Sequence, residues 1–156
     1  MTNSLRFLQI FALGTWVGSI IYLSFVVAPG VFGTIPNRDQ AGAVVGLVLG
    51  RLHHLGVIAA VIYLVAGLGL GRSFKALIQP AALCVIVMLL LTVASQRLVT
   101  PRMAALRTEM VSVDATPRDN PLRLEFDRLH RASVQLEVAT LLIGIAALYL
   151  TVRAKL

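Results

Sequence analysis

The sequence is poor in cysteine, in charged residues and in motifs that carry known chemistry. Its single cysteine, Cys84, lies inside an apolar run, which excludes an intramolecular disulfide framework and a cysteine-based zinc site. Only 13% of the 156 residues are charged, against about a quarter in soluble domains. The sequence contains no CxxCH haem motif, no HExxH zinc motif, no legible Ser–His–Asp pattern and no Gly-rich phosphate loop after a strand. It therefore gives no positive argument for an enzyme.

Hydrophobic residues make up 58% of the chain and gather in four long runs. Each run is close to the roughly 20 residues that a helix needs to cross hydrocarbon, and alternating barrel strands are absent. We therefore predict an all-α protein, an integral membrane four-helix bundle in a single domain. The net charge of +7 comes from basic residues that flank the runs, which favours lipid headgroups over nucleic acid as partners. The predicted spans are residues 5–28, 55–71, 76–96 and 132–152.

Helical patterns continue beyond three of the spans. Residues 38–54 run into the second span without a proline, and Asn37 with Gln40 resembles a capping box at their start. Asn120 and Pro121 are typical of the N-cap and first position of the fourth helix. We expect helical extensions past the bilayer on one side, separated by a loop at 111–120.

Four crossings place both termini on one side, called here the tail side, and helix ends near 29–54 and 96–131 on the other, called the histidine side. Lys and Arg are more numerous on the histidine side, so the positive-inside rule predicts that it is cytoplasmic and that the termini lie opposite. Its basic residues are Arg38, Arg51, Arg97, Arg102, Arg107, Arg118, Arg123, Arg128 and Arg131, against Arg6, Arg72, Lys75, Arg153 and Lys155 on the tail side.

Glycines recur at four-residue spacing, which puts a bare stripe on one helix face and lets helices approach closely in lipid. Packing within the chain is the simpler interpretation, and a homo-oligomer seam along the second series is the alternative. The three series are Gly14 and Gly18; Gly42, Gly46 and Gly50; Gly67 and Gly71.

Glu137 lies within the apolar part of the fourth helix and shares one face with His130 and Ser133. A carboxylate at that depth must find a donor, bind a cation or take up a proton. We expect Arg97, Gln96 or Tyr22 as its partner, with the indole N–H of Trp16 deeper in the same pocket. A structural Glu137–Arg97 pair and a site for a cation, proton or polar ligand both remain open.

His53, His54 and His130 all lie at helix ends on the histidine side. We expect His130 to face the bundle interior within about 10 Å of His53 or His54, which makes a haem b or metal site geometrically possible. Histidine at a membrane interface is also a common hydrogen-bonding anchor.

Four motifs resemble one family in order along nearly the whole chain. They are "LGTWVGSIIYLSFVVAPGVF", "AGAVVGLVLGRLHHLG", "VTPRM" and "FDRLHRASVQLE". The sequence is similar to the domain-of-unknown-function 4149 family, which includes eukaryotic transmembrane protein 205. Its W-x-G, A-P-x-x-F and F-x-x-L-H-x-x-S patterns correspond to Trp16, Gly18, Ala28, Pro29, Phe32, Phe126, Leu129, His130 and Ser133. The resemblance implies a four-helix membrane protein and no established reaction. Where the family usually has Asn, this chain has Glu137.

Three functional hypotheses follow. The leading one is binding or transport of a small ligand or ion through a polar pocket that opens toward the histidine side. The second is a b-type haem or metal protein that uses His130 with His53 or His54. The third is a structural or assembly subunit, in a homo-oligomer or with another membrane protein, whose polar residues only fix packing.

Overall fold

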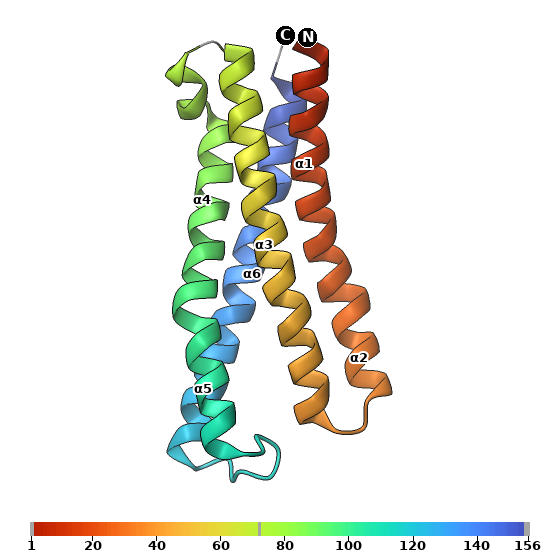
Figure 1. Ribbon diagram of the computed structural model, residues 1–156, viewed down its shortest axis with the longest axis vertical. Helices are drawn as coiled ribbons and strands as arrows, with labels where there is room; N and C mark the ends of the chain where they lie inside the picture. Colours follow the sequence, from red (N-terminus) through yellow and green to blue (C-terminus); the bar gives the residue numbers. More distant parts are fainter. Residues whose placement is uncertain (1, 72, 155–156) are drawn as a thin grey trace.

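The structure, a computed structural model, describes residues 2–71 and 73–154 as four helical columns that alternate in direction (Figure 1). Both ends of the described chain lie at the same end of the bundle. Column one comprises α1 (Thr2–Tyr22), the π-helical η1 (Leu23–Val27) and α2 (Ala28–Thr34). Column two is α3 (Arg38–Gly71), column three is α4 (Pro80–Ala94), the π-helical η3 (Ser95–Val99) and α5 (Thr100–Met110), and column four is α6 (Pro121–Arg153).

The four columns are 31 to 34 residues long and apolar enough to cross a membrane, and the described residues include no strand. The predicted all-α fold with four membrane-spanning helices is thus confirmed. At 1.5 Å per residue each column is roughly 50 Å long, whereas the hydrocarbon core is about 30 Å thick. Each column is therefore longer than a perpendicular crossing requires.

Prolines explain why two columns are interrupted. The π-helical segments η1 and η3 each end two residues before a proline, Pro29 and Pro101. Proline has no N–H and its ring clashes with the carbonyl four residues earlier, so a regular α-turn cannot continue through it without adjustment. A π-turn accommodates one extra residue, and one residue of an α-helix corresponds to about 100° of rotation. In column three the buried side chains nevertheless keep a regular helical spacing through η3, at Met88, Thr92, Ser95 and Val99.

The connections begin and end with local hydrogen bonds. Asn37 accepts the Gln40 N–H at 3.0 Å, and Asn120 accepts the Leu122 N–H at 2.9 Å, as the sequence predicts for both helix starts. A short 3₁₀ helix, η2 (Phe74–Ile78), lies between α3 and α4 and precedes Pro80. Arg72, counted above among the tail-side cations, lies outside the described residues, as does Lys155.

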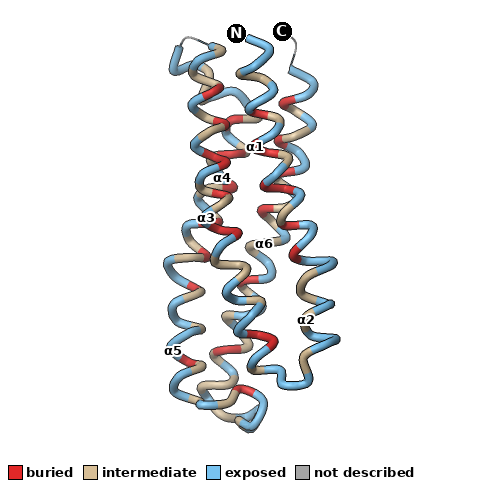
Figure 2. The backbone as a smooth tube through the Cα atoms, turned by 45° about the vertical axis from the view of Figure 1, so that its right-hand side comes forward, coloured by how far each residue is buried: buried red, intermediate tan, exposed pale blue. Residues whose placement is uncertain are grey.

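The main core runs through the upper part of the bundle, where α1 and α4 each pack against both α3 and α6 (Figure 2). Two close approaches require glycine. A Cβ on Gly56 would lie 2.5 Å from Nε1 of Trp16, and a Cβ on Gly144 would lie 2.7 Å from Val17. These two glycines, rather than the four-residue series, set the tightest contacts between helices. The fully buried large side chains of this region include Leu13, Trp16, Ile20, Val85 and Met88.

A second, smaller core forms at the other end of the bundle from Leu106, Val113 and Phe126. It lies under the loop at residues 111–120, which joins α5 to α6. Arg107 lies over the Phe126 ring, with its guanidinium carbon 5.2 Å from the ring centroid. The Arg107 guanidinium also lies against Gly42. A Cβ added to Gly42 would lie 2.8 Å from a guanidinium nitrogen of Arg107. This end is held by contacts between the starts of α3 and α6 and the loop.

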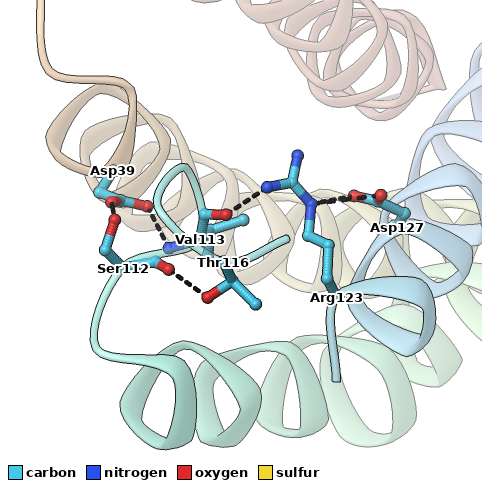
Figure 3. Close-up of polar contacts among 6 residues, drawn as sticks. All are labelled: Asp39, Ser112, Val113, Thr116, Arg123 and Asp127. Atoms are coloured by element: carbon cyan, nitrogen blue, oxygen red, sulfur yellow. Dashed lines mark hydrogen bonds and ion pairs between the residues drawn. The ribbon is translucent and has the colours of Figure 1, made fainter. Parts of the chain in front are cut away.

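Asp39, in the first turn of α3, ties the loop to that helix (Figure 3). Its carboxylate accepts the Ser112 hydroxyl at 2.6 Å and the Val113 N–H at 3.0 Å. The Ser112 hydrogen bond, helped by backbone N–H groups and Arg107, holds the pKa of the Asp39 carboxyl below its ordinary value. Arg123 completes the network by donating to the Val113 carbonyl and to Asp127.

Candidate functional site

Glu137 is paired with His53 inside the bundle. Oε1 of Glu137, on α6, lies 2.6 Å from Nε2 of His53, on α3. The His53 side chain is 1% exposed and the Glu137 side chain is 16% exposed. A proton must lie between the two atoms at this distance, donated by the imidazole or shared with the carboxyl group. The contact therefore joins two titratable groups within the bundle.

The predicted partners of Glu137 were wrong. Arg97 is exposed, Tyr22 is 60% exposed, and Gln96 donates to Nε2 of His54 at 3.2 Å. Ser95 continues the buried face of this column, three residues after Thr92, so Gln96 and Arg97 point away from the core. Tyr22 is the last residue before the other π segment, η1.

Three buried polar atoms have no hydrogen-bond partner among the residues that the structure describes. They are Nε1 of Trp16, Nδ1 of His53 and Oγ of Ser95. Trp16 packs on Gly56, one helical turn after His53 on α3. Buried polar atoms normally have partners, and leaving one without costs about 1–3 kcal/mol. Each of these three atoms therefore keeps an unused hydrogen-bonding capacity inside the bundle.

All four columns contribute a buried polar side chain to the bundle. Trp16 comes from α1, His53 from α3, Ser95 from η3, and Ser133 with Glu137 from α6. Ser133 lies one turn before Glu137 and is 8% exposed. Sequence analysis predicted Trp16, Ser133 and Glu137 for the pocket but not Ser95. A single serine in the apolar run was the signal that could have indicated it.

Glu137 lines neither of two hollows in the part of the bundle that the structure describes. A groove of about 450 Å³ between α1 and α3 on the histidine side is lined by Gly14, Gly18, Tyr22 and Arg51, but not by Glu137. A larger cavity lies at the opposite, tail-side end of the bundle and is described below.

The three histidines do not converge. His130 is exposed and stacks on Phe126, with ring centroids 6.4 Å apart, so the prediction that it faces the bundle interior was wrong. His54 is exposed, and its Nδ1 donates to the Gly50 carbonyl at 2.7 Å. Among the described residues no group of three His, Cys, Asp or Glu side chains could hold a metal ion. Adjacent residues on a helix diverge by about 100°, which separates His53 from His54.

The predicted glycine series divide into two groups. Gly42, Gly67 and Gly71 meet side chains of this chain, namely Arg107, Gln9 and Ala76. Packing within the chain therefore explains these three glycines. In the second group, no atom lies within 4 Å of an added Cβ at Gly14, Gly18, Gly46 or Gly50.

Comparison with known proteins identifies a family without assigning a reaction. The family model described as "Domain of unknown function (DUF4149)" matches residues 11–112. No curated protein and no solved structure matches the chain. Trp16, His53 and Ser95 lie within the matched segment, whereas Glu137 lies beyond it. Because the match covers more than half of the sequence, this four-helix membrane protein belongs to the DUF4149 family.

Proposed function

We propose that this protein binds a small cation or protonated polar solute inside the membrane, in exchange with a proton, at the site formed by Glu137 and His53. The observation that supports the proposal is the 2.6 Å contact between the buried His53 and the partly buried Glu137. Ionisable residues within membrane helices pair with one another and commonly line ion or proton pathways.

The proposed chemistry follows from the need to compensate the negative charge of the Glu137 carboxylate inside the membrane. Charge inside hydrocarbon is costly, so Glu137 separates from His53 only when it takes up a proton or when a cation replaces the imidazole. Ser133, one turn away on α6, and Ser95, from η3, add hydroxyl oxygens that suit such a ligand. The Nδ1 atom of His53 and the indole N–H of Trp16 offer further hydrogen-bonding capacity.

Thermal unfolding of the detergent-purified protein tests this proposal. Choline chloride is replaced at constant ionic strength by LiCl, NaCl, KCl or MgCl2, at about pH 6 and about pH 8. A bound ion stabilises the folded protein by about 2.7 kcal/mol at a hundred times its dissociation constant. We expect at least one cation to raise Tm for the wild type and for Glu109→Gln, a control at an exposed glutamate, but not for Glu137→Gln.

Two results would contradict the proposal. One is a wild-type Tm that does not depend on cation identity. The other is a cation-dependent Tm that persists in Glu137→Gln. In the first case the pair only links α3 to α6, as the structural-subunit hypothesis holds.

A haem or metal site is less well supported by the residues present. Nε2 of His53 is engaged with Glu137, and both ring nitrogens of His54 have hydrogen-bond partners. Since His130 is exposed and stacks on Phe126, the imidazoles do not fit an axial pair, and we derive no step through such a group. A homo-oligomer seam at Gly46 and Gly50 remains a prediction.

A further inference from the structure

The tail-side end of the bundle contains a cavity of about 820 Å³. It lies between the start of α1, the end of α3, the start of α4 and the end of α6. Its volume falls within the range of about 300–1,000 Å³ that is typical of small-molecule sites. Apolar side chains that line it include Leu64, Leu70, Leu77, Pro80 and Leu150.

The polar side chains at the inner end of the cavity already have hydrogen-bond partners within the protein. Gln9 donates to the Tyr63 carbonyl at 3.1 Å, the Tyr63 hydroxyl bonds Oγ1 of Thr151 at 2.7 Å, and the Thr151 hydroxyl donates to the Ala147 carbonyl at 2.7 Å. This chain fixes the wall in place and leaves no buried polar atom of its own without a partner. Recognition of a ligand must therefore come from the apolar lining and from the charges around the opening.

Those charges are all positive. Arg6, Lys75 and Arg153 line the cavity, and no carboxylate side chain does. The seven acidic residues of the sequence lie at position 39 and between 109 and 137, all toward the histidine side of the bundle. Arg6 is held in place because it donates to the Thr151 carbonyl at 3.1 Å. The cavity thus combines an apolar interior with a cationic opening, which is complementary to an anionic amphiphile.

The segment beside the opening has the character of a membrane interface. Phe74 and Ile78 of η2 are 81% and 67% exposed, next to Lys75. Exposed apolar side chains adjacent to a cation suit a segment that contacts acyl chains and headgroups together.

We propose that this cavity binds an anionic glycerophospholipid of the surrounding bilayer. The phosphate lies against Lys75 and Arg153, and one acyl chain occupies the apolar interior beside Leu70 and Leu77. This site is at the opposite end of the bundle from the histidine side, and the inference is independent of the function proposed for Glu137.

Native mass spectrometry of the full-length protein in detergent tests the inference. The protein is titrated with dioleoyl phosphatidylglycerol, with dioleoyl phosphatidylcholine and with glycerol phosphate, the soluble headgroup alone. A Lys or Arg near an anionic lipid contributes about 1 kcal/mol, or about fivefold in affinity. We expect phosphatidylglycerol to bind at least about fivefold more tightly than phosphatidylcholine, and Lys75→Gln to reduce that preference about fivefold.

Two variants separate the cavity from general surface charge. Arg118→Gln, at an exposed arginine in the loop at 111–120, should leave the preference unchanged. Ala81→Phe, which fills part of the cavity, should weaken binding of both lipids, with helicity by circular dichroism as the folding check. Equal binding of the two lipids, equal losses in Lys75→Gln and Arg118→Gln, or competition by glycerol phosphate as strong as by the lipid would each overturn the inference.

Discussion

Nε2 of His53, on α3, lies 2.6 Å from Oε1 of Glu137, on α6. Glu137→Ala would leave a buried imidazole nitrogen without a partner, which costs about 1–3 kcal/mol in addition to the lost packing. Glu137→Gln keeps an acceptor and nearly the same volume, so we expect a smaller loss. Thermal unfolding in detergent measures both, with Glu109→Ala as the exposed control. Small and equal effects would mean that the carboxylate is solvated.

Gly56 permits the closest approach of α3 to the fully buried Trp16. Gly56→Ala would put a Cβ 2.5 Å from the indole nitrogen, and we expect a destabilisation of about 1–3 kcal/mol from overpacking. Gly46→Ala on the same helix meets no atom within 4 Å and should be neutral in the monomer. If Gly46→Ala instead proves the more damaging, an interface with a second chain covers that face.

The carboxylate of Asp39 makes the free energy of unfolding depend on pH in the acid range. Because its pKa is lowered in the folded protein, its contribution is present above about pH 3.9 and is lost as pH falls through the lowered pKa. We expect Asp39→Asn to cost about 1–2 kcal/mol near neutral pH and to flatten the acid limb of the stability curve. Asp119→Asn, at an exposed loop residue, should lose stability at acid pH in the same way as the wild type. Acid-dependent unfolding followed by circular dichroism provides the comparison.

Val111 occupies a strained position at the end of α5. Its φ is 63° and its ψ is −47°, and the Ser112 N–H bonds the Met110 carbonyl at 2.7 Å across it, which defines a γ-turn. The side chain is 90% exposed, so packing does not offset the strain. Val111→Gly should stabilise the protein by about 1 kcal/mol, whereas Val111→Ala, which keeps a Cβ, should not. Chemical denaturation of the wild type and of both variants measures their free energies of unfolding and so tests this order of stability.

Topology provides a fifth prediction. The positive-inside rule assigns the histidine side to the cytoplasm and both termini to the opposite face. Alkaline phosphatase fused after the C-terminus in a bacterial host should then be active, and green fluorescent protein fused after Ala115 should fluoresce. The reverse pattern would show that net charge, which is more positive on the tail side, sets the orientation instead.

The fold was largely predictable because apolar runs and helix-start residues act locally. Asn37 and Asn120 cap their helices with the hydrogen bonds that their sequence context predicts. The apolar runs are long enough to cross a bilayer, and the sequence lacks the alternation of barrel strands. Helices are then the way to hydrogen-bond every backbone N–H and C=O group in lipid. The loop network of Asp39 was not predicted, because it joins residues 73 or more positions apart that no local pattern relates.

The partner of Glu137 was not predictable from local patterns. Gln96 and Arg97 were expected to face it, but Ser95, at regular helical spacing from Met88 and Thr92, faces the core instead. Sequence analysis named His53 as a candidate ligand because it shares a membrane side with His130, and its carboxylate partner lies 84 positions away on a helix that no local pattern relates to it.

The chain contains one tryptophan, and Trp16 packs on Gly56 one helical turn from His53. The emission of an indole depends on the polarity around it and on quenching by nearby charged groups, including protonated imidazole. The tryptophan fluorescence of this protein therefore originates entirely beside the His53–Glu137 pair. An optical titration of the unlabelled protein would report protonation or ion binding at that pair, whatever solute the membrane environment supplies.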